Sequence, residues 1–213
     1  MGYGNEISNK FETVTFPSSS TDQFETRTIQ GRRNKQILLR RVFATCGTAA
    51  SFLDVCIPKH KYKTTLNTAT AAAATTGVIL DGDDDGYIGG HQITSNDLLL
   101  ISTDGGADAS NQGNAWRLCS ISAHVETAAS DIVTITVAGL DGITGIENAC
   151  SAGAECYIIR PADKVQIPVG NATVEKEYWA SGEVNAPVVF YMDPAGATAH
   201  DFNALAEFVG PLS

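Results

Sequence analysis

The sequence predicts a mainly β protein: an antiparallel sandwich or barrel-like body with an extended N-terminal arm and a short C-terminal helix. Three features of the 213 residues lead to this fold class. Short apolar runs follow one another at short spacing, Asp or Gly turn signals separate them, and no long helical pattern lies between them. Many short strands without interleaved helices are typical of sandwiches and barrels.

The first 36 residues are predicted to form the arm. They are polar and poor in large aliphatic side chains, so they lack the apolar surface that a self-sufficient fold must bury. Residues 12–16 and 24–29 alternate apolar and polar positions and could become strands when they meet a sheet edge. We therefore divide the chain into an extended N-terminal arm, residues 1–36, and a β-rich body, residues 37–213.

The clearest strand in the body is predicted at its centre, where Val133, Ile135 and Val137 alternate with threonines. Such alternation gives a strand one apolar face and one polar face. The same criteria, with turn residues closing each run, predict strands at residues 37–46, 52–57, 77–80, 98–102, 116–125, 132–138, 156–160, 165–169, 173–179 and 187–192.

Two segments depart from the strand pattern. Residues 64–76 are low in complexity and rich in Ala and Thr, and they fit either a helical turn or an ordered loop. Residues 201–209 place apolar residues at i, i+3, i+4 and i+7 from Phe202. Asp201 is suited to cap a helix there, and the following Gly-Pro pair is suited to end it. This pattern predicts one short C-terminal helix packed on the sheet.

Charge is distributed unevenly along the chain. The whole sequence has 14 Lys and Arg against 24 Asp and Glu, a net charge of −10. Residues 27–63 hold nine cations against one acid, Asp54, and residues 64–213 hold four cations against 19 acids, so their net charges are +8 and −15. Such asymmetry indicates an interaction surface. The candidate partner-binding residues are Arg27, Arg32, Arg33, Lys35, Arg40 and Arg41.

Two kinds of partner suit a basic segment. Aromatic residues interleaved with its cations, such as Phe43 and Tyr62, are also found in nucleic-acid-binding surfaces. However, the sequence has no RNP-like or helix-turn-helix signature, and a region with a charge of −15 would repel phosphates. We therefore expect contact with an acidic protein, or head-to-tail contact between copies of the chain, rather than with nucleic acid.

The most specific local pattern is an acidic loop, residues 81–92. Asp81, Asp83 and Asp85 stand at positions 1, 3 and 5 of an EF-hand-like loop, and a glycine follows at position 6. At position 12, Gln92 replaces the usual glutamate, so one neutral oxygen replaces two anionic ones. A calcium site with these four ligands is one hypothesis. The other is an acidic turn that joins two strands and binds no ion.

Several classes of protein are disfavoured. The sequence has neither a run of about 20 apolar residues nor a basic and apolar leader at its start, so it predicts no membrane span and no secretion signal. Its five cysteines are too few and too irregularly spaced for a disulfide framework, which favours synthesis in a reducing cytoplasm. No nucleophile, zinc or phosphate-binding motif is present, so we expect no enzymatic activity. A hydrolase would need a cluster of carboxylates or histidines that only the fold can assemble.

Residues 93–122 resemble a strand–loop–strand unit of tailed-phage fibre and head-decoration proteins. In those proteins a Gly-Asp turn leads into an apolar strand, and an Asn-Gly-aromatic motif opens the next one. Here Asn96 and Asp97 precede the strand 98–102, and the next strand opens with Asn114, Ala115 and Trp116. The whole profile is similar to capsid decoration (cement) proteins, which have a flexible arm, a Thr/Ala/Gly-rich β body and no catalytic motif. This resemblance implies binding at symmetry axes of an icosahedral shell, often as a trimer.

Two functional hypotheses follow. The first is a structural virion protein, a phage capsid decoration protein made in the host cytoplasm that binds the outside of the shell and stabilises it. It requires no cofactor, and its partners are the major capsid protein and copies of itself. The alternative is a calcium-dependent β-rich recognition module, a fibre or adhesion domain that binds a receptor or glycan through the acidic loop.

Overall fold

The chain folds into two compact units, each with its own core. The computed structural model describes residues 10–15, 25–46, 51–102, 116–127, 130–140, 145–146, 148–169, 174–193 and 200–209. One unit combines Met1–Ile57 with Val165–Ser213, and the other is Pro58–Lys164. This division differs from the predicted one at residue 36, because the described strands of the first 36 residues pair with strands from the end of the chain. The mainly β fold class is confirmed.

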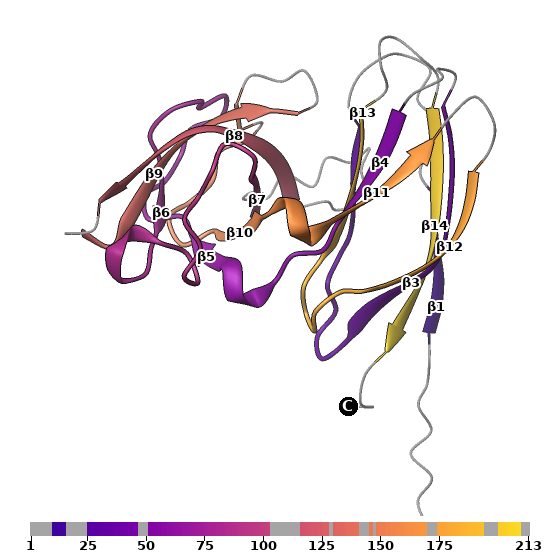
Figure 1. Ribbon diagram of the computed structural model, residues 1–213. Helices are drawn as coiled ribbons and strands as arrows, with labels where there is room; N and C mark the ends of the chain where they lie inside the picture. The colour runs from indigo at the N-terminus through magenta and orange to yellow at the C-terminus, as the bar shows by residue number, and fades with distance from the viewer. Residues whose placement is uncertain are drawn as a thin grey trace, which may run out of the picture. The chain divides into compact units, whose positions relative to one another are not determined.

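The first unit is a sandwich of two four-stranded antiparallel sheets, drawn as two layers in Figure 1. One sheet has the order β1-β14-β3-β12 and the other β11-β4-β13-β2. Buried side chains from both sheets form one core, to which Leu39 and Phe202 contribute from the first and Val55 and Phe190 from the second. The strands are β1 (Lys10–Thr15), β2 (Glu25–Ile29), β3 (Gln36–Cys46), β4 (Ser51–Cys56), β11 (Lys164–Val169), β12 (Val174–Ser181), β13 (Val188–Asp193) and β14 (His200–Val209).

A bulge in β3 changes which residues of that strand face the core. Leu39 and Arg41 pair with adjacent residues of β14, so Arg40 is the extra residue. A bulge of this kind shifts the alternation of side chains by one position. The buried positions are accordingly Leu39 before the bulge and Val42 and Ala44 after it. Arg40 and Arg41 therefore lie where the pairing of β3 with β14 is interrupted.

The C-terminal segment forms strand β14, and the predicted helix at residues 201–209 is wrong. Its backbone pairs with β3 on one side and β1 on the other. Phe202, Ala204, Ala206 and Phe208 are buried at every second position. The same residues satisfy both a helical and an alternating pattern, and pairing with two neighbouring strands decides between them because it buries two phenylalanines in the sandwich core.

The described parts of both alternating pieces of the predicted arm, residues 12–15 and 25–29, lie in strands. β1 pairs with β14 over six residues, and β2 pairs with β13 over five. Each strand lies at the edge of its sheet. The two pieces were predicted to pair with a sheet edge, and strands β14 and β13 of the same chain provide that edge.

The second unit is a six-stranded antiparallel sheet with the order β5-β10-β7-β8-β9-β6 that curls into a nearly closed barrel. The two end strands approach each other at an isolated bridge between Leu66 and Leu80. A separate core fills this unit. Its strands are β5 (Lys63–Thr65), β6 (Val78–Asp81), β7 (Leu98–Ser102), β8 (Trp116–Thr127), β9 (Ile132–Gly139) and β10 (Glu155–Ile159), and its short 3-10 turns are η1 (His60–Tyr62), η2 (Asp84–Gly86) and η4 (Pro161–Asp163).

The Ala/Thr-rich segment 64–76 continues from β5 as an ordered loop. Thr70 forms a bridge with Cys150, and the Ala73 amide donates to the Ile146 carbonyl. Gly145 packs closely against this loop, because a Cβ on Gly145 would lie 2.1 Å from the Ala74 carbonyl oxygen. Of the two predicted forms, a helical turn or an ordered loop, the structure has the ordered loop. No helix in the described part of the chain is long and apolar enough to cross a membrane.

Candidate functional site

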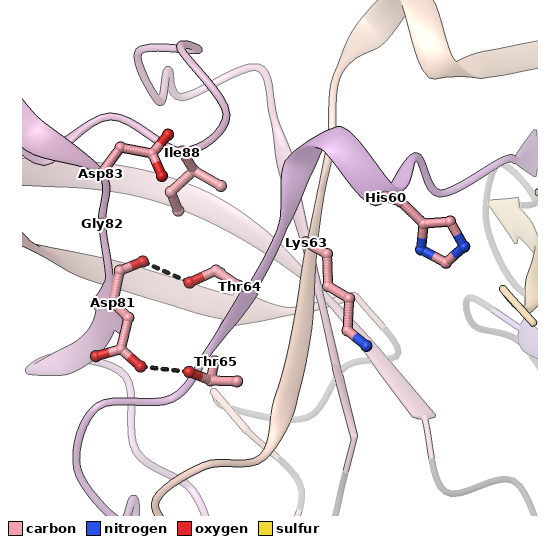
Figure 2. Close-up of a pocket in the computed structure, with 8 residues that line it drawn as sticks. All are labelled: His60, Lys63, Thr64, Thr65, Asp81, Gly82, Asp83 and Ile88. Carbon is pink, nitrogen blue, oxygen red and sulfur yellow. Dashed lines mark hydrogen bonds between the residues drawn. The ribbon is translucent and has the colours of Figure 1, made fainter.

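The acidic loop begins where β6 ends, and its first carboxylate holds the barrel seam together. Asp81 Oδ1 accepts a hydrogen bond from Asn67 Nδ2 at 2.7 Å, and Asp81 Oδ2 accepts one from the Thr65 hydroxyl. The Thr64 hydroxyl donates to the Asp81 backbone carbonyl. Figure 2 shows the contacts of Thr64 and Thr65 with Asp81, from β5 to β6. Asp81 thus links the two end strands where their backbones are no longer paired.

The other proposed calcium ligands lie apart from Asp81. The Asp83 carboxylate accepts a hydrogen bond from the Gly90 amide at 3.2 Å, and Figure 2 shows it directed away from the Asp81 carboxylate. Asp85 and Gln92 are both exposed. Asp85 lies at a left-handed φ of 79° inside the η2 turn, so the loop does not wrap as an EF-hand does. Within the described ranges, no three His, Cys, Asp or Glu side chains are grouped to hold a metal ion.

A pocket of about 440 Å³ opens beside this seam. Ile88, which is buried, contributes an apolar side chain to its lining. On the opposite wall, Lys63 Nζ forms an ion pair with Glu155 at 2.5 Å, and the His60 ring lies 6.1 Å from the ring of Tyr157. The lining residues, drawn in Figure 2, are His60, Lys63, Thr64, Thr65, Asp81, Gly82, Asp83 and Ile88.

A buried carboxylate, which the sequence placed only in the turn before strand 98–102, fixes the end of the same loop. Asp97 is completely buried, and its Oδ2 accepts from the Thr94 amide at 2.7 Å and lies 2.8 Å from His91 Nε2. The His91 ring contacts the edge of Tyr62 at 5.7 Å between centroids. The spacing Thr94-x-x-Asp97 is the signal that could have identified this turn, since a carboxylate there reaches back to the backbone.

Tyr62 also contacts Arg160. The Arg160 guanidinium carbon lies 4.0 Å from the Tyr62 ring centroid, a cation–π contact. Arg160 makes a bidentate pair with Asp163, with nitrogen–oxygen distances of 2.7 and 3.0 Å. The hydrogen bond that Arg160 donates to Asp163 raises the pKa of Arg160 above its usual value. The Arg160–Asp163 pair and its contact with Tyr62 join η1 to η4. These contacts serve the structure of the barrel unit, and nothing in their arrangement requires a substrate.

The predicted basic residues divide into two groups in the sandwich. Arg40 is bound to Glu207, with Nε 2.5 Å from Oε2, and the guanidinium of Arg41 lies 5.7 Å from the Phe43 ring centroid. Arg27 donates to a neighbouring backbone carbonyl in β2. The remaining three, Arg32, Arg33 and Lys35, lie together on the connection between β2 and β3.

This connection is joined to the turn between β12 and β13. The Asn34 amide donates to Asn185 Oδ1 at 2.6 Å, and the Asn185 amide donates to the Lys35 carbonyl at 2.9 Å. A Cβ on Gly31 would lie 2.2 Å from the Asn185 carbonyl oxygen, so only glycine permits this approach. We call the two joined turns, residues 31–35 and 183–186, the sandwich tip.

Four cysteines have buried thiols. They are Cys56, Cys119, Cys150 and Cys156. Burial raises the pKa of the Cys156 thiol well above its usual value, because the thiolate would lose its hydration. A raised pKa is the opposite of what a nucleophilic cysteine needs, so Cys156 is a core residue.

No protein-family model matches the chain, and searches of curated proteins and of solved structures also return no match.

Proposed function

We propose that the protein is a structural component of a phage virion, a capsid decoration protein that binds the outside of the shell and stabilises it. One observation carries the proposal. The chain leaves the sandwich after β4 and returns at β11, and these two strands are neighbours in one sheet. The barrel is thus an insertion with its own core, so the sandwich can be held by a partner while the barrel folds independently.

The local resemblance agrees with this proposal. The two strands in that resemblance are β7 and β8, which pair as antiparallel neighbours from Leu98↔Ser120 to Ser102↔Trp116. The loop between them, residues 103–115, lies outside the described residues. On this proposal the major capsid protein and further copies of the chain are the partners, the oligomer is a trimer, and the protein is located on the capsid exterior.

Cosedimentation with capsids tests the proposal. Capsids assembled without the protein are mixed with the purified chain, and bound protein is quantified after pelleting. We expect saturable binding with a fixed number of copies per capsid, and bound capsids that withstand higher temperature than bare ones. Absence of binding to such capsids would overturn the proposal. Light scattering on the free protein measures the oligomer directly.

A recognition module is the second candidate, and the pocket beside the barrel seam favours it. Hydroxyl, carboxylate and ammonium groups line that pocket around one apolar side chain, as in sites that bind hydroxyl-rich ligands such as glycans. A glycan array probed with the whole protein tests this candidate. Binding that Thr65→Val and Asp83→Ala abolish, while capsid binding is absent, would favour recognition over decoration. Loss of glycan binding in chelator would support the calcium-dependent form of the hypothesis.

A further inference from the structure

We propose that the sandwich tip is the surface that docks on the partner, and that the partner presents an acidic protein surface there. The inference rests on the proposed function, in which this partner surface is the outer face of the shell. Of the six candidate partner-binding cations, the inference keeps the three that the fold places on the tip, Arg32, Arg33 and Lys35.

Hydrogen bonds hold the two turns of the tip together. Two hydrogen bonds cross between its turns, and each turn also closes on itself, through Lys35 amide to Arg32 carbonyl at 3.0 Å and Ala186 amide to Glu183 carbonyl at 3.1 Å. Asn34 and Asn185 both adopt left-handed φ angles, 57° and 67°, which asparagine tolerates better than most residues. A surface held this way loses little conformational entropy on binding.

The chemistry of the tip suits a protein interface. Val184 is 45% exposed, and Arg33 on the facing turn is exposed as well. The Arg32 guanidinium carbon lies 4.0 Å from the Phe208 ring centroid, so this cation is oriented by the sandwich core. An exposed apolar side chain beside arginines and amides matches the composition of interface centres, where arginine is enriched.

Charge decides the class of partner. The sandwich unit carries 8 Lys and Arg against 11 Asp and Glu, a net charge of −3, and the barrel unit carries 6 against 13, a net charge of −7. The tip has three cations and one acid, Glu183, so it is a local positive surface on an acidic protein. A long polyanion such as duplex DNA would meet repulsion from the rest of the chain. A few carboxylates that contact only the tip would not meet this repulsion.

Arg40, a predicted cation on β3, is excluded from this surface by what it already contacts. Arg40 is committed to the buried Glu207 carboxylate. A partner that recruited Arg40 would leave that carboxylate buried and unpaired, which costs several kcal/mol. The docking surface therefore consists of the tip and does not extend along β3.

Charge reversal on the tip tests the inference. In the capsid cosedimentation experiment we compare the parent protein with Arg33→Glu, with the charge-conserving Arg33→Lys, and with Lys61→Glu as a matched control. Lys61 is also exposed but belongs to the barrel unit. We expect Arg33→Glu to weaken binding about tenfold or more, and Arg33→Lys and Lys61→Glu to stay within about threefold of the parent. Thermal unfolding confirms that each variant is folded, and Val184→Ser replaces Arg33→Glu if that variant is not.

The outcomes separate the inference from the function on which it rests. If the parent does not bind capsids, the proposed function fails and the inference fails with it. If the parent binds and Arg33→Glu and Val184→Ser bind equally well, the inference alone is overturned. A short DNA duplex offered in place of capsids should not bind. Binding of that duplex that Arg33→Glu abolishes would overturn the acidic protein partner in favour of nucleic acid.

Discussion

The Arg40 guanidinium donates to the Glu207 carboxylate across the pairing of β3 and β14, with Nε 2.5 Å from Oε2. Glu207 is buried on the face of β14 opposite Phe208, with a side chain only 1% exposed. The β3 bulge provides the extra residue that reaches it. The bulge that interrupts the pairing of β3 with β14 thus places the Arg40 cation beside the buried Glu207 carboxylate.

Replacing Arg40 should therefore destabilise the sandwich strongly. Arg40→Ala leaves the Glu207 carboxylate buried without its cation, and we expect a loss of about 3–5 kcal/mol in the free energy of unfolding. Urea unfolding measures it. Arg41→Ala is the matched control on the same strand and should cost about 1 kcal/mol or less, since its contact with Phe43 is a cation–π contact. Equal losses in the two variants would contradict a special role for the Arg40–Glu207 pair.

Asp81 should stabilise the barrel without an ion. Asp81→Ala removes the acceptor for Thr65 and Asn67, and we expect a loss of about 1–3 kcal/mol in the free energy of unfolding, the same in calcium and in chelator. Thermal unfolding in both buffers checks this. Asp83→Ala combined with Asp85→Ala is the control, because both residues are exposed. A rise in the parent's Tm with calcium that this double variant removes would instead establish the calcium site.

Stability should fall in alkaline solution through Cys156. The folded protein keeps the thiol protonated because its pKa is raised, whereas the unfolded chain loses that proton near pH 9. The unfolded state then binds fewer protons, so this contribution is complete below about pH 9 and declines above it, by at most about 1.4 kcal/mol per pH unit. Urea unfolding between pH 7 and 10 in a reducing buffer measures the slope. Cys156→Ala should reduce the slope, and an unchanged slope would show that other groups cause it.

The barrel should fold without the sandwich. Pro58–Lys164 has its own core, and its end strands approach each other through Leu66 and Leu80. Expressed alone, this fragment should unfold in one cooperative transition. Circular dichroism and dispersed amide NMR signals test it. Leu80→Ala in the fragment should lower stability by about 2–5 kcal/mol. A fragment that is unfolded by both methods would show that the two units depend on each other.

The sequence allowed the strands to be predicted but not their partners. All ten predicted body strands overlap observed ones, because alternation and turn residues are local signals. The pairing of β1 with β14 joins the two ends of the chain, and no local pattern encodes such a contact. The error at residues 201–209 has the same origin: Ala and Leu suit a helix, and two neighbouring strands impose the extended form.

The candidate sites were predicted in part for similar reasons. The pattern of the acidic loop identified Asp81, and the distribution of charge identified the basic segment. Neither could show that Thr65 and Asn67 would donate hydrogen bonds to the Asp81 carboxylate. Charge alone could not separate Arg40, committed to Glu207, from Arg33 on the tip. The sequence placed Asp97 in a turn but could not predict its complete burial, which depends on the packing of several distant segments.

Hydrogen–deuterium exchange on free and capsid-bound protein tests the central claim most directly, namely that the sandwich tip attaches the protein to the shell. We predict that binding slows exchange in peptides covering residues 31–36 and 182–187 and leaves the β8–β9 hairpin unchanged. Protection confined to the barrel, with exchange at the tip unaltered, would contradict the account.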